Sequence, residues 1–411
     1  MADRLTDAVL IETLQVRRAH PDLASAAGAL GLSERVLRER TAAAKARGLT
    51  ASSMLADPMT RLKLRVAALE RENRALQRSA DTAERIREEI HGLAATPPRP
   101  PSWLTEPAGL APDTPGVPMV LWSDWHWGER VFKDEVGGVN QFDRRIAKQR
   151  VRVLTDKIRL LAMGHMVRPV YPGIVVMLGG DFITGDIHDE LRETNEGTVQ
   201  EALLEVEEHL IAALDAMAHT FGRVFVPCVV GNHGRGTLKP RAKHRIYTSF
   251  EWNLYCHLER HFRKDSRFLF MVPNETDARF RVFGHRFTLT HGDALGVRGG
   301  DGIIGALGPI ARGAMKVGRS EAHIGRDFDT LVMGHWHTYI PRGDAVPVIV
   351  NGPLKGYDEF ARIFLRAPFA RPSQALWFLH PVHGVTSQWQ IFLDAPPTPS
   401  KKTAWVSFEP K

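Results

Sequence analysis

Short apolar runs that each end in a polar residue recur through the second half of the chain. Such runs predict buried strands, and the segments between them have the spacing and length of helices. The strands are expected within 118–124, 173–181, 223–233, 285–293 and 330–335, and the longer helices within 141–163 and 196–219. Alternating strands and helices predict an α/β fold, in which groups at the carboxyl ends of parallel strands meet at one edge of the sheet.

Further apolar runs towards the C-terminus also predict strands. They lie within 346–352, 375–381 and 386–394, and we expect them to complete a second sheet. Residues 118–395 are therefore interpreted as one α/β domain, followed by a tail over 396–411. Tyr357, which follows the last of the polar strand ends, is a candidate contact to a ligand.

A different pattern, helical throughout, covers residues 1–50. Asp22 and Ser33 are expected to cap two short helices on either side of a tight turn at Gly31. This pattern resembles the small helix-turn-helix modules of transcriptional regulators and transposases, and the alternative is a helical hairpin used for packing. Eight Lys and Arg against six Asp and Glu leave this module nearly neutral. The second helix still offers basic residues that can face DNA, namely Arg35, Arg38, Arg40, Lys45 and Arg47.

Residues 58–93 repeat apolar residues at spacings of three and four, as a coiled coil does. The seam comprises Met59, Leu62, Val66, Leu69, Asn73, Leu76, Ala80 and Ala83. A polar Asn at an a position favours a parallel two-stranded coiled coil, so we expect a homodimer through this segment. The alternative is a single helix lying on the α/β domain. Eight prolines within 96–118 exclude a regular helix there, so 96–117 is interpreted as a stiff linker.

Composition and charge exclude several classes of protein. The net charge of +7 is compatible with an anionic partner but does not choose between nucleic acid, nucleotide and membrane surface. Cys228 and Cys256 are not spaced as a metal or redox pair, which argues against a disulfide framework. No run approaches the roughly 18 apolar residues of a membrane span, and the N-terminus lacks the apolar core of a signal peptide. We therefore expect a cytoplasmic protein that does not bind a membrane.

The polar residues that end the predicted strands form five short motifs. Each motif alone occurs often by chance, and a lone His after a strand is more often a structural residue. Together they supply the carboxylate, amide and imidazole ligands that a site for two metal ions requires. In chain order they are Asp124-Trp-His126, Gly180-Asp181, Gly231-Asn232-His233, His291-Gly-Asp293 and Gly334-His335-Trp-His337.

This set of motifs resembles that of the calcineurin-like metallophosphoesterase superfamily, and the resemblance covers residues 118–357. It implies a two-sheet α/β sandwich flanked by helices and a site for two divalent cations. It also implies that His233 contacts the scissile phosphate and acts as general acid rather than as a metal ligand. One cation would be held by Asp124, His126, Asp181 and His337, and the other by Asp181, Asn232, His291 and His335, with Asp181 bridging them.

Two positions depart from patterns within this superfamily. Members usually have Glu or Asp after the GNH motif to orient its histidine, but here Gly234 follows His233, so the orienting group must come from elsewhere. The DNA break-repair nucleases carry a histidine three positions after the bridging aspartate, and here that position is Thr184. The segments WSDWHWGE and GDIHDELRETNE look instead like phosphoesterases encoded by bacteriophages and prophages, which are often labelled DNA-repair exonucleases by analogy.

Residues near the motifs are candidate substrate contacts. The loop after His233 is basic and has no acid, and Arg235, Lys239 and Arg241 in it are expected to hold the phosphates of a polyanion. The alternative is a solvated basic loop. His188 is a further candidate contact, with a structural hydrogen bond as the alternative. The glycine-rich stretch 292–318 is interpreted either as a lid or as a simple loop.

The sequence therefore predicts a metal-dependent phosphoesterase. The mixed nitrogen and oxygen ligands suit Mn²⁺ best, with Fe²⁺ or Zn²⁺ as alternatives. Two such ions activate a water and neutralise phosphate charge, so no Ser or Cys nucleophile is required. The leading hypothesis is a nuclease or phosphodiesterase brought to DNA as a dimer. The alternatives are a phosphoesterase acting on nucleotides or phosphoproteins, and a non-enzymatic DNA-binding scaffold with a vestigial metal site.

Overall fold

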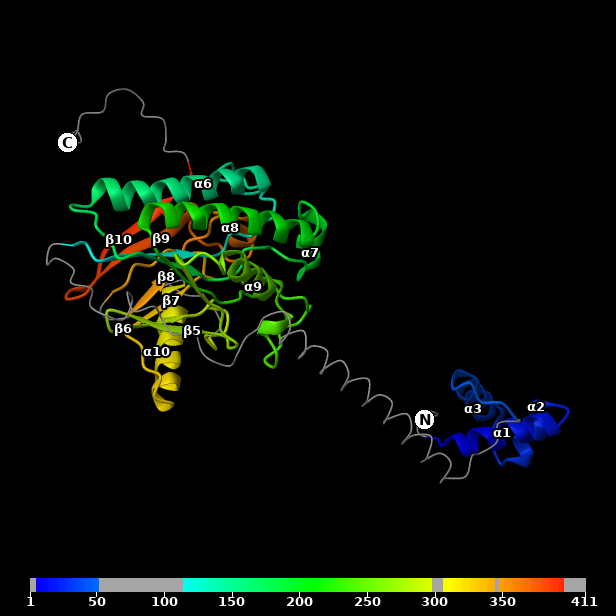
Figure 1. Cartoon of the computed structure of the whole chain (residues 1–411). Coiled ribbons are helices and arrows are strands. Elements are labelled where there is room, and N and C mark those ends of the chain that lie inside the picture. Colours follow the sequence, from blue (N-terminus) through cyan, green and yellow to red (C-terminus); the bar gives the residue numbers. More distant parts are fainter. Residues whose placement is uncertain (1–4, 52–113, 298–305, 344–346, 395–411) are drawn as a thin grey trace, which may run out of the picture. The chain divides into compact units, whose positions relative to one another are not determined.

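The structure is a computed structural model that describes residues 5–51, 114–297, 306–343 and 347–394 (Figure 1). The chain divides into two compact units, Met1–Thr96 and Pro97–Lys411. Three of the predicted segments lie outside the described residues wholly or for the most part, namely the coiled coil over 58–93, the linker over 96–117 and the tail over 396–411.

The described part of the N-terminal unit comprises the helices α1 (Asp7–Ala19), α2 (Leu23–Ala29) and α3 (Glu34–Ala46). Both predicted caps are present, since a side-chain oxygen of Asp22 accepts from the Ser25 amide at 2.7 Å and that of Ser33 from the Val36 amide at 3.4 Å. Gly31, with a φ of +63°, makes the turn between α2 and α3 in a conformation that glycine adopts without strain. The buried apolar side chains of this unit are Leu10, Ile11, Ala26, Ala27, Leu37 and Ala44.

Three of the predicted DNA-facing residues of the N-terminal unit have acidic partners. Arg38 lies 3.1 Å from Glu34, and Arg35 lies 3.8 Å from Glu39. Arg47 pairs with Asp7 of α1 at 3.1 Å. Exposed pairs of this kind contribute little stability, but they reduce the positive charge that α3 offers to a partner. DNA binding by this unit stays a prediction.

The second unit is built on two sheets (Figure 1). The larger has the strand order β10-β9-β1-β2-β3-β4 and the smaller β5-β6-β7-β8. Strands β1 to β4 run parallel, as do β6, β7 and β8. The larger sheet comprises β1 (Val117–Trp122), β2 (Ile174–Leu178), β3 (Val224–Pro227), β4 (Phe268–Met271), β9 (Ser373–His380) and β10 (Gly384–Phe392). The smaller comprises β5 (Ala278–Val282), β6 (His285–Leu289), β7 (Thr330–Met333) and β8 (Val348–Val350).

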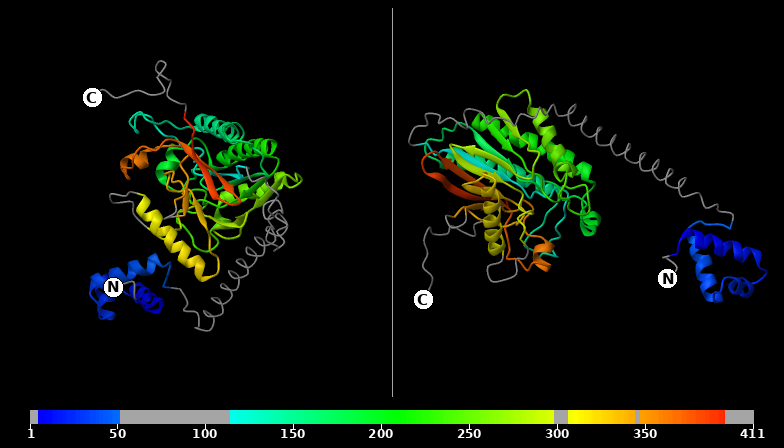
Figure 2. Two further views of the ribbon diagram at one scale, coloured as in Figure 1. Left: turned by 90° about the vertical axis from the view of Figure 1, so that its left-hand side faces the viewer. Right: turned by 90° about the horizontal axis from the view of Figure 1, so that it is seen from below.

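Helices cover the outer faces of both sheets. Figures 1 and 2 show α6 and α8 side by side over the larger sheet, and α10 against the smaller one. Two short turns complete the described elements, the π-helical η2 (Leu161–His165) and the 3₁₀ turn η3 (Ile246–Thr248). The helices are α6 (Arg144–Leu160), α7 (Asp189–Thr194), α8 (Val199–Phe221), α9 (Phe250–Phe262), α10 (Leu307–His323) and α11 (Glu359–Ile363).

Alternation of side chains along the strands produces the layers. In β1, Val120 and Trp122 pack under the helices, whereas Met119 and Leu121 belong to the core between the two sheets. In β7, Val332 faces that same inter-sheet core. Its neighbours Leu331 and Met333 face α10 instead. The unit is therefore a two-sheet α/β sandwich flanked by helices, with four layers.

All five predicted strands that end in a polar motif are present, as β1, β2, β3, β6 and β7. The placement of the C-terminal strands was only partly correct. Of these strands β8 alone joins the smaller sheet, while β9 and β10 extend the larger one. β9 pairs antiparallel with β1 and is buried along almost its whole length. An apolar run predicts a buried strand but carries no information on which sheet edge it joins.

Two expectations from composition can be compared with the described residues. Cys228 and Cys256 are buried free thiols, and no disulfide joins them. Among the described helices, none combines the length and the apolar character that crossing a membrane requires.

Candidate metal centre

The candidate centre lies where the carboxyl ends of β1, β2, β3, β6 and β7 turn into loops. The backbones of these loops hydrogen-bond to one another. The amide of Asp124 donates to the carbonyl oxygen of Gly180, and the amide of His126 donates to the carbonyl oxygen of Asp181. Both hydrogen bonds are 3.0 Å long. The amide of His335 donates to the Asp124 carboxylate at 2.8 Å. Motifs that are far apart in sequence are therefore held against one another.

Five residues of these loops adopt left-handed backbone conformations. Such conformations are unfavourable for residues other than glycine and cost on the order of 1 kcal/mol each. They cluster at functional sites, where surrounding structure enforces them. Of the ten non-glycine residues with positive φ in the described part of the chain, half are these five: Asp124, His126, Asp181, His335 and His337, with φ between +50° and +65°.

Three glycines of the motifs, Gly180, Gly231 and Gly334, have no room for a side chain, and at two of them the obstacle is a carboxylate. A Cβ at Gly231 would overlap the Asp181 carboxylate, and one at Gly334 would overlap the Asp124 carboxylate. The motif glycines therefore allow the strand-end loops to approach the two carboxylates closely.

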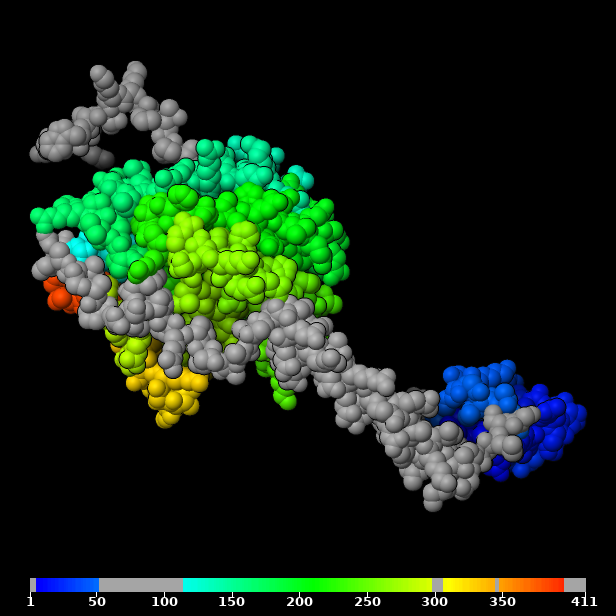
Figure 3. Space-filling view, viewed as in Figure 1, coloured from blue at the N-terminus to red at the C-terminus, as the bar shows by residue number. Residues whose placement is uncertain are grey.

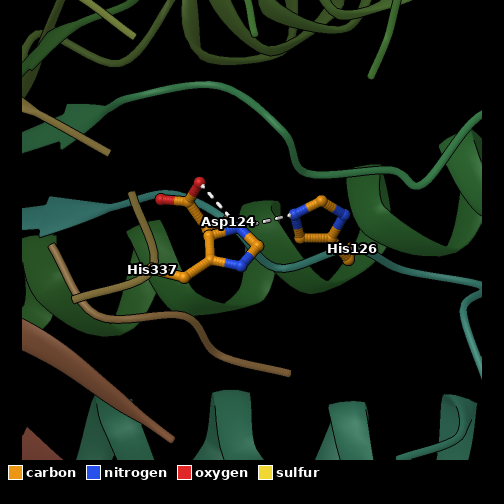
Figure 4. Close-up of side chains that lie close together, drawn as sticks. All are labelled: Asp124, His126 and His337. Atoms are coloured by element: carbon orange, nitrogen blue, oxygen red, sulfur yellow. Dashed lines mark hydrogen bonds and ion pairs between the residues drawn. The ribbon is translucent and has the colours of Figure 1, made fainter. Parts of the chain in front are cut away.

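The first half of the centre contains Asp124, His126 and His337 (Figure 4). The Nε2 atoms of His126 and His337 point at each other across 3.1 Å. The Nε2 atom of His337 also lies 3.4 Å from Oδ1 of Asp124. One ligand atom from each of these three residues lies within 4.8 Å of the other two. Asp124 and His126 are fully buried, so the pair of carboxylate and imidazole sits at the bottom of the centre.

The second half contains Asp181, His291 and His335. The Nε2 atom of His291 lies 2.9 Å from Oδ2 of Asp181 and 3.1 Å from Oδ1 of Asn232. Its Nδ1 atom lies 2.8 Å from the carbonyl oxygen of Gly179. Because a carbonyl only accepts, Nδ1 carries a proton, and Nε2 is the nitrogen that faces the shared space.

Asp181 belongs to both halves. It groups with His291 and His335 on one side and with His126 and His233 on the other. Its Oδ1 atom also accepts a hydrogen bond from the His233 amide at 2.7 Å. The structure therefore brings all seven predicted ligands and His233 to one place, with Asp181 between the two groups.

Burial and the neighbouring charges set the protonation of the centre. Burial by itself raises the pKa of Asp181, but His291 and the other imidazoles outweigh it and hold the pKa well below its ordinary value. Burial lowers the pKa of His335 to about 4 and that of His126 well below its ordinary value. Burial also lowers the pKa of His291, but Asp181 outweighs it and raises the pKa to about 10. The ionised Asp181 carboxylate and the neutral imidazoles of His126 and His335 are ligand forms that a cation takes, whereas a cation would have to displace the second proton that Asp181 holds on His291. The donor set therefore fits divalent metal ions.

His233 lies against the first half, with its ring centroid 4.6 Å from that of His126. Its Nδ1 atom donates to the carbonyl oxygen of Thr184 at 2.8 Å. This contact supplies the orienting group that the sequence left unidentified. Burial lowers the pKa of His233 to about 4, so its imidazole is neutral in the absence of a substrate. Sequence offered no signal for this partner, because the acceptor is a backbone atom.

The predicted substrate contacts differ in how exposed their side chains are and in whether those side chains already form hydrogen bonds within the protein. His188 is exposed just before α7, with its ring centroid 6.1 Å from that of His233. Lys239 and Arg241 are also exposed. Arg235, by contrast, hydrogen-bonds the carbonyl oxygens of Asn232, Thr237 and Leu238 at 2.6, 2.9 and 3.1 Å. Its guanidinium therefore holds its own loop in shape. Tyr357 has a comparable structural role, since its hydroxyl donates to the carbonyl oxygen of Ala367.

Sequence reasoning missed Glu251, a fully buried acid in the first turn of α9. One carboxylate oxygen accepts from the Phe182 amide at 2.6 Å and the other from the Gly231 amide at 2.7 Å. The side chain thus ties the loop after β2 to the loop after β3. Burial, with the nearby Asp181 charge, raises the pKa of Glu251 to about 7. The only signal in the sequence was an acid within the apolar run SFEWNLY.

Comparisons with known proteins do not assign the chain to a family. No family model matches it, and no curated protein matches it. Among solved structures it is similar to a dimetal phosphatase from Danio rerio, with 13% sequence identity over 68% of this chain and 100% of that chain. The TM-score of that match is 0.32, which is too low to carry an inference about function. The functional assignment therefore depends on the arrangement of the side chains.

Proposed function

We propose that this chain is a metal-dependent phosphoesterase with two cations in one centre. The observation that carries the proposal is the convergence of seven oxygen and nitrogen donors, five of them on strained left-handed residues. The first cation would be held by Asp124, His126, Asp181 and His337. The second would be held by Asp181, Asn232, His291 and His335.

The proposed cations are divalent ions that accept imidazole as well as carboxylate. Four of the seven donors are imidazoles, which favours Mn²⁺, Fe²⁺ or Zn²⁺ over Mg²⁺ or Ca²⁺, and Mn²⁺ is our proposal. Bound there, two such ions would supply an activated water and positive charge beside a phosphate. His337, more exposed than the buried Asp124 and Asp181, lies where the centre opens to solvent.

His233 is the proposed general acid. Its Nδ1 proton is committed to the Thr184 carbonyl, so Nε2 is the atom that can face a substrate. Only the doubly protonated imidazole can donate from Nε2, and a bound phosphate anion would favour that form. His188, exposed beside His233, is a further proposed contact to the substrate.

We propose a phosphodiester of DNA as the substrate, and two exposed surfaces of the second unit support this choice. The first is the loop after His233, where Lys239, Arg241 and Lys243 are exposed. Unlike Arg245, which forms a bidentate pair with Asp293 at 2.7 and 2.8 Å, these three residues have no acidic partner within the described residues. Basic side chains without an acidic partner, on the loop that begins at His233, favour a substrate with several phosphates.

The second surface is the segment 360–369, in which aromatic and basic residues alternate. Phe360, Phe364 and Phe369 are exposed by 59%, 71% and 49%. Arg362 and Arg366, between them, are exposed as well. Exposed rings interleaved with arginines favour single-stranded nucleic acid, because bases stack on the rings while arginines face phosphates. The segment follows directly on the loop that contacts Asp124, where the Leu354 amide donates to the Asp124 carbonyl oxygen at 3.0 Å.

Two alternatives remain distinct from this proposal. In the first alternative the chain would be a phosphoesterase for nucleotides or phosphoproteins, and in the second a DNA-binding scaffold without activity. Hydrolysis of bis-p-nitrophenyl phosphate in the presence of Mn²⁺, lost in Asp181→Ala, would exclude the scaffold. No hydrolysis by the full-length protein with Mn²⁺, Fe²⁺ or Zn²⁺ would contradict the proposed function. Comparing single-stranded, double-stranded and nicked DNA with nucleotides and a phosphopeptide then identifies the substrate class.

A further inference from the structure

Three charged side chains lie buried together, and one of them is next to His126. Glu129 and Lys355 are each exposed by only 5%, and Asp358 by 4%. The Nζ atom of Lys355 lies 2.8 and 3.0 Å from the two oxygens of Glu129, and 2.6 Å from Asp358. Burying three charges is expensive, and such ion pairs seldom stabilise a fold more than apolar residues would. The group therefore needs an explanation other than stability.

The carboxylate of Glu129 faces the Nδ1 atom of His126, on the side of the ring away from His337. The Nδ1 atom of His126 is buried without a hydrogen-bond partner in the described residues, and Oε2 of Glu129 lies 3.4 Å from it. On the other side of the ring, Nε2 points at the Nε2 atom of His337. If Nε2 holds a ligand, the proton is on Nδ1 and requires an acceptor. Oxygens at such distances commonly move closer once the ligand is bound.

Glu129 also reaches His233, through Thr184. The hydroxyl of Thr184 donates to the same Oε2 atom at 3.4 Å. The carbonyl oxygen of Thr184 accepts the Nδ1 proton of His233 at 2.8 Å. Thr184 is fully buried, and its own amide donates to the Trp127 carbonyl oxygen at 3.2 Å. One carboxylate oxygen thus lies between a proposed metal ligand and the residue that orients the proposed acid.

The backbone that carries Lys355 is itself fixed. Its carbonyl oxygen accepts from the guanidinium of Arg150 at 2.6 Å and from the side-chain amide of Asn140 at 2.9 Å. Arg150 and Asn140 are both buried and hydrogen-bond each other at 2.9 Å. Lys355 is therefore held in one place, where its charge fixes the position of the Glu129 carboxylate.

We propose that Glu129 and Lys355 are positioning residues for two groups, the proposed metal ligand His126 and the proposed general acid His233. Glu129 holds the proton-bearing side of His126 and, through Thr184, sets the direction of His233. Lys355 keeps Glu129 in that position. The inference rests on the proposed function, and it explains why a buried charged group lies beside the centre. It also gives Thr184 a role in place of the histidine that the break-repair nucleases have there.

Titration of the full-length protein with Mn²⁺ by calorimetry is the first test. We expect wild type to bind two ions, and Glu129→Gln to weaken one of them by about 10- to 100-fold while leaving the other unchanged. Glu321→Gln is the matched control, because it breaks a half-buried pair with Arg279 at 2.9 Å that joins α10 to β5, away from the centre. Unfolding midpoints of both variants show whether each still folds.

The second test separates positioning from simple structural support. Thr184→Val keeps the shape of the side chain and removes its hydroxyl, so we expect unchanged Mn²⁺ binding. A misdirected acid should slow a poor leaving group more than a good one. We therefore expect kcat to fall by at least about tenfold more for a dinucleotide than for bis-p-nitrophenyl phosphate in Thr184→Val and in Glu129→Gln.

The possible results separate failure of the positioning role from failure of the proposed function. If wild type binds two Mn²⁺ ions and folded Glu129→Gln binds both equally well, the positioning role is wrong while the proposed function stands. Equal losses of kcat on both substrates would also overturn the role of Glu129 and Thr184 in directing His233. If wild type binds no Mn²⁺, Fe²⁺ or Zn²⁺, the proposed function itself fails, and this inference with it.

Discussion

The Nδ1 atom of His233 donates a hydrogen bond to the backbone carbonyl oxygen of Thr184 across 2.8 Å. Thr184 is one of the two positions where the sequence departs from the calcineurin-like pattern that it resembles. The other is Gly234, which follows His233 where that pattern usually has an acid. The structure relates the two departures. A backbone oxygen orients the histidine, and the Glu251 side chain fills the space beside Gly234. Glu251 belongs to α9, which lies on the face of the second unit shown in Figure 3.

Gly234 is the first position to test. A Cβ there would lie 2.6 Å from Cγ of Glu251, and that side chain cannot move without releasing the Phe182 and Gly231 amides. We expect Gly234→Ala to destabilise the protein by about 1–3 kcal/mol and to lower kcat. Gly234→Glu, which would restore the usual residue, should be worse. Urea unfolding and hydrolysis of bis-p-nitrophenyl phosphate measure the two effects.

Gly236 in the same loop provides the control for Gly234. The nearest atom to a Cβ at Gly236 is the Thr248 carbonyl oxygen at 3.4 Å, which is ordinary contact. Gly236→Ala should therefore fold and react as wild type does. Equal behaviour of the two alanine variants would contradict the proposed packing of Glu251.

Glu251 itself should be necessary for the geometry of the centre. Glu251→Ala leaves the Phe182 and Gly231 amides buried without acceptors, at a cost of about 1–3 kcal/mol for each. Because those amides fix the loops that carry Asp181 and Asn232, we expect weaker Mn²⁺ binding as well as lower stability. Glu259→Ala, an acid on the same helix with no ion pair to the centre, is the matched control. A Glu251→Ala protein with wild-type stability and Mn²⁺ affinity would rule this role out.

Much of the centre could be predicted from the sequence, for a physical reason. Buried strands produce apolar runs, and parallel strands of one sheet place their carboxyl ends together, so the motifs at Asp124, Asp181 and Asn232 had to converge. His291 and His335 follow strands of the smaller sheet, and no local pattern encodes how the two sheets pack. Glu129, Glu251 and Lys355 could not be found that way, because they act through tertiary contacts that no local pattern encodes. Their only trace was a charged residue inside or beside an apolar run.

Metal ions should stabilise the folded protein. Without cations, the carboxylates of Asp124 and Asp181 lie buried together and five residues hold strained backbones. We expect Mn²⁺ at about 100 times its dissociation constant to add about 2.7 kcal/mol for each independent site, and a chelator to remove it. Mg²⁺ at equal concentration should add less, because imidazole donors disfavour it. Thermal unfolding of wild type and His335→Ala with and without chelator measures this, and identical midpoints in every condition would contradict a metal centre.

The exposed aromatic and basic segment should contribute to binding single-stranded DNA. In chelator, where no turnover occurs, we expect Phe364→Ser with Arg366→Ser to weaken binding of a single-stranded oligonucleotide by at least about tenfold, because stacking contributes about 1–3 kcal/mol per base. Val382→Ser, at a position exposed by 79% on a different turn, is the control. Fluorescence anisotropy measures the affinities. Loss of activity on DNA with unchanged oligonucleotide binding would mean that the segment acts otherwise.

Residues 58–93 should hold two copies of the chain together. The apolar seam with Asn73 at an a position favours a parallel two-stranded coiled coil. We expect full-length protein to run as a dimer in light scattering and the unit 97–411 to run as a monomer. Leu69→Glu with Leu76→Glu should give a monomer that still hydrolyses bis-p-nitrophenyl phosphate, since the centre lies entirely within the second unit. If those substitutions left the mass unchanged, the dimer would have to form through another surface. If they abolished hydrolysis in a folded monomer, catalysis would depend on the second copy.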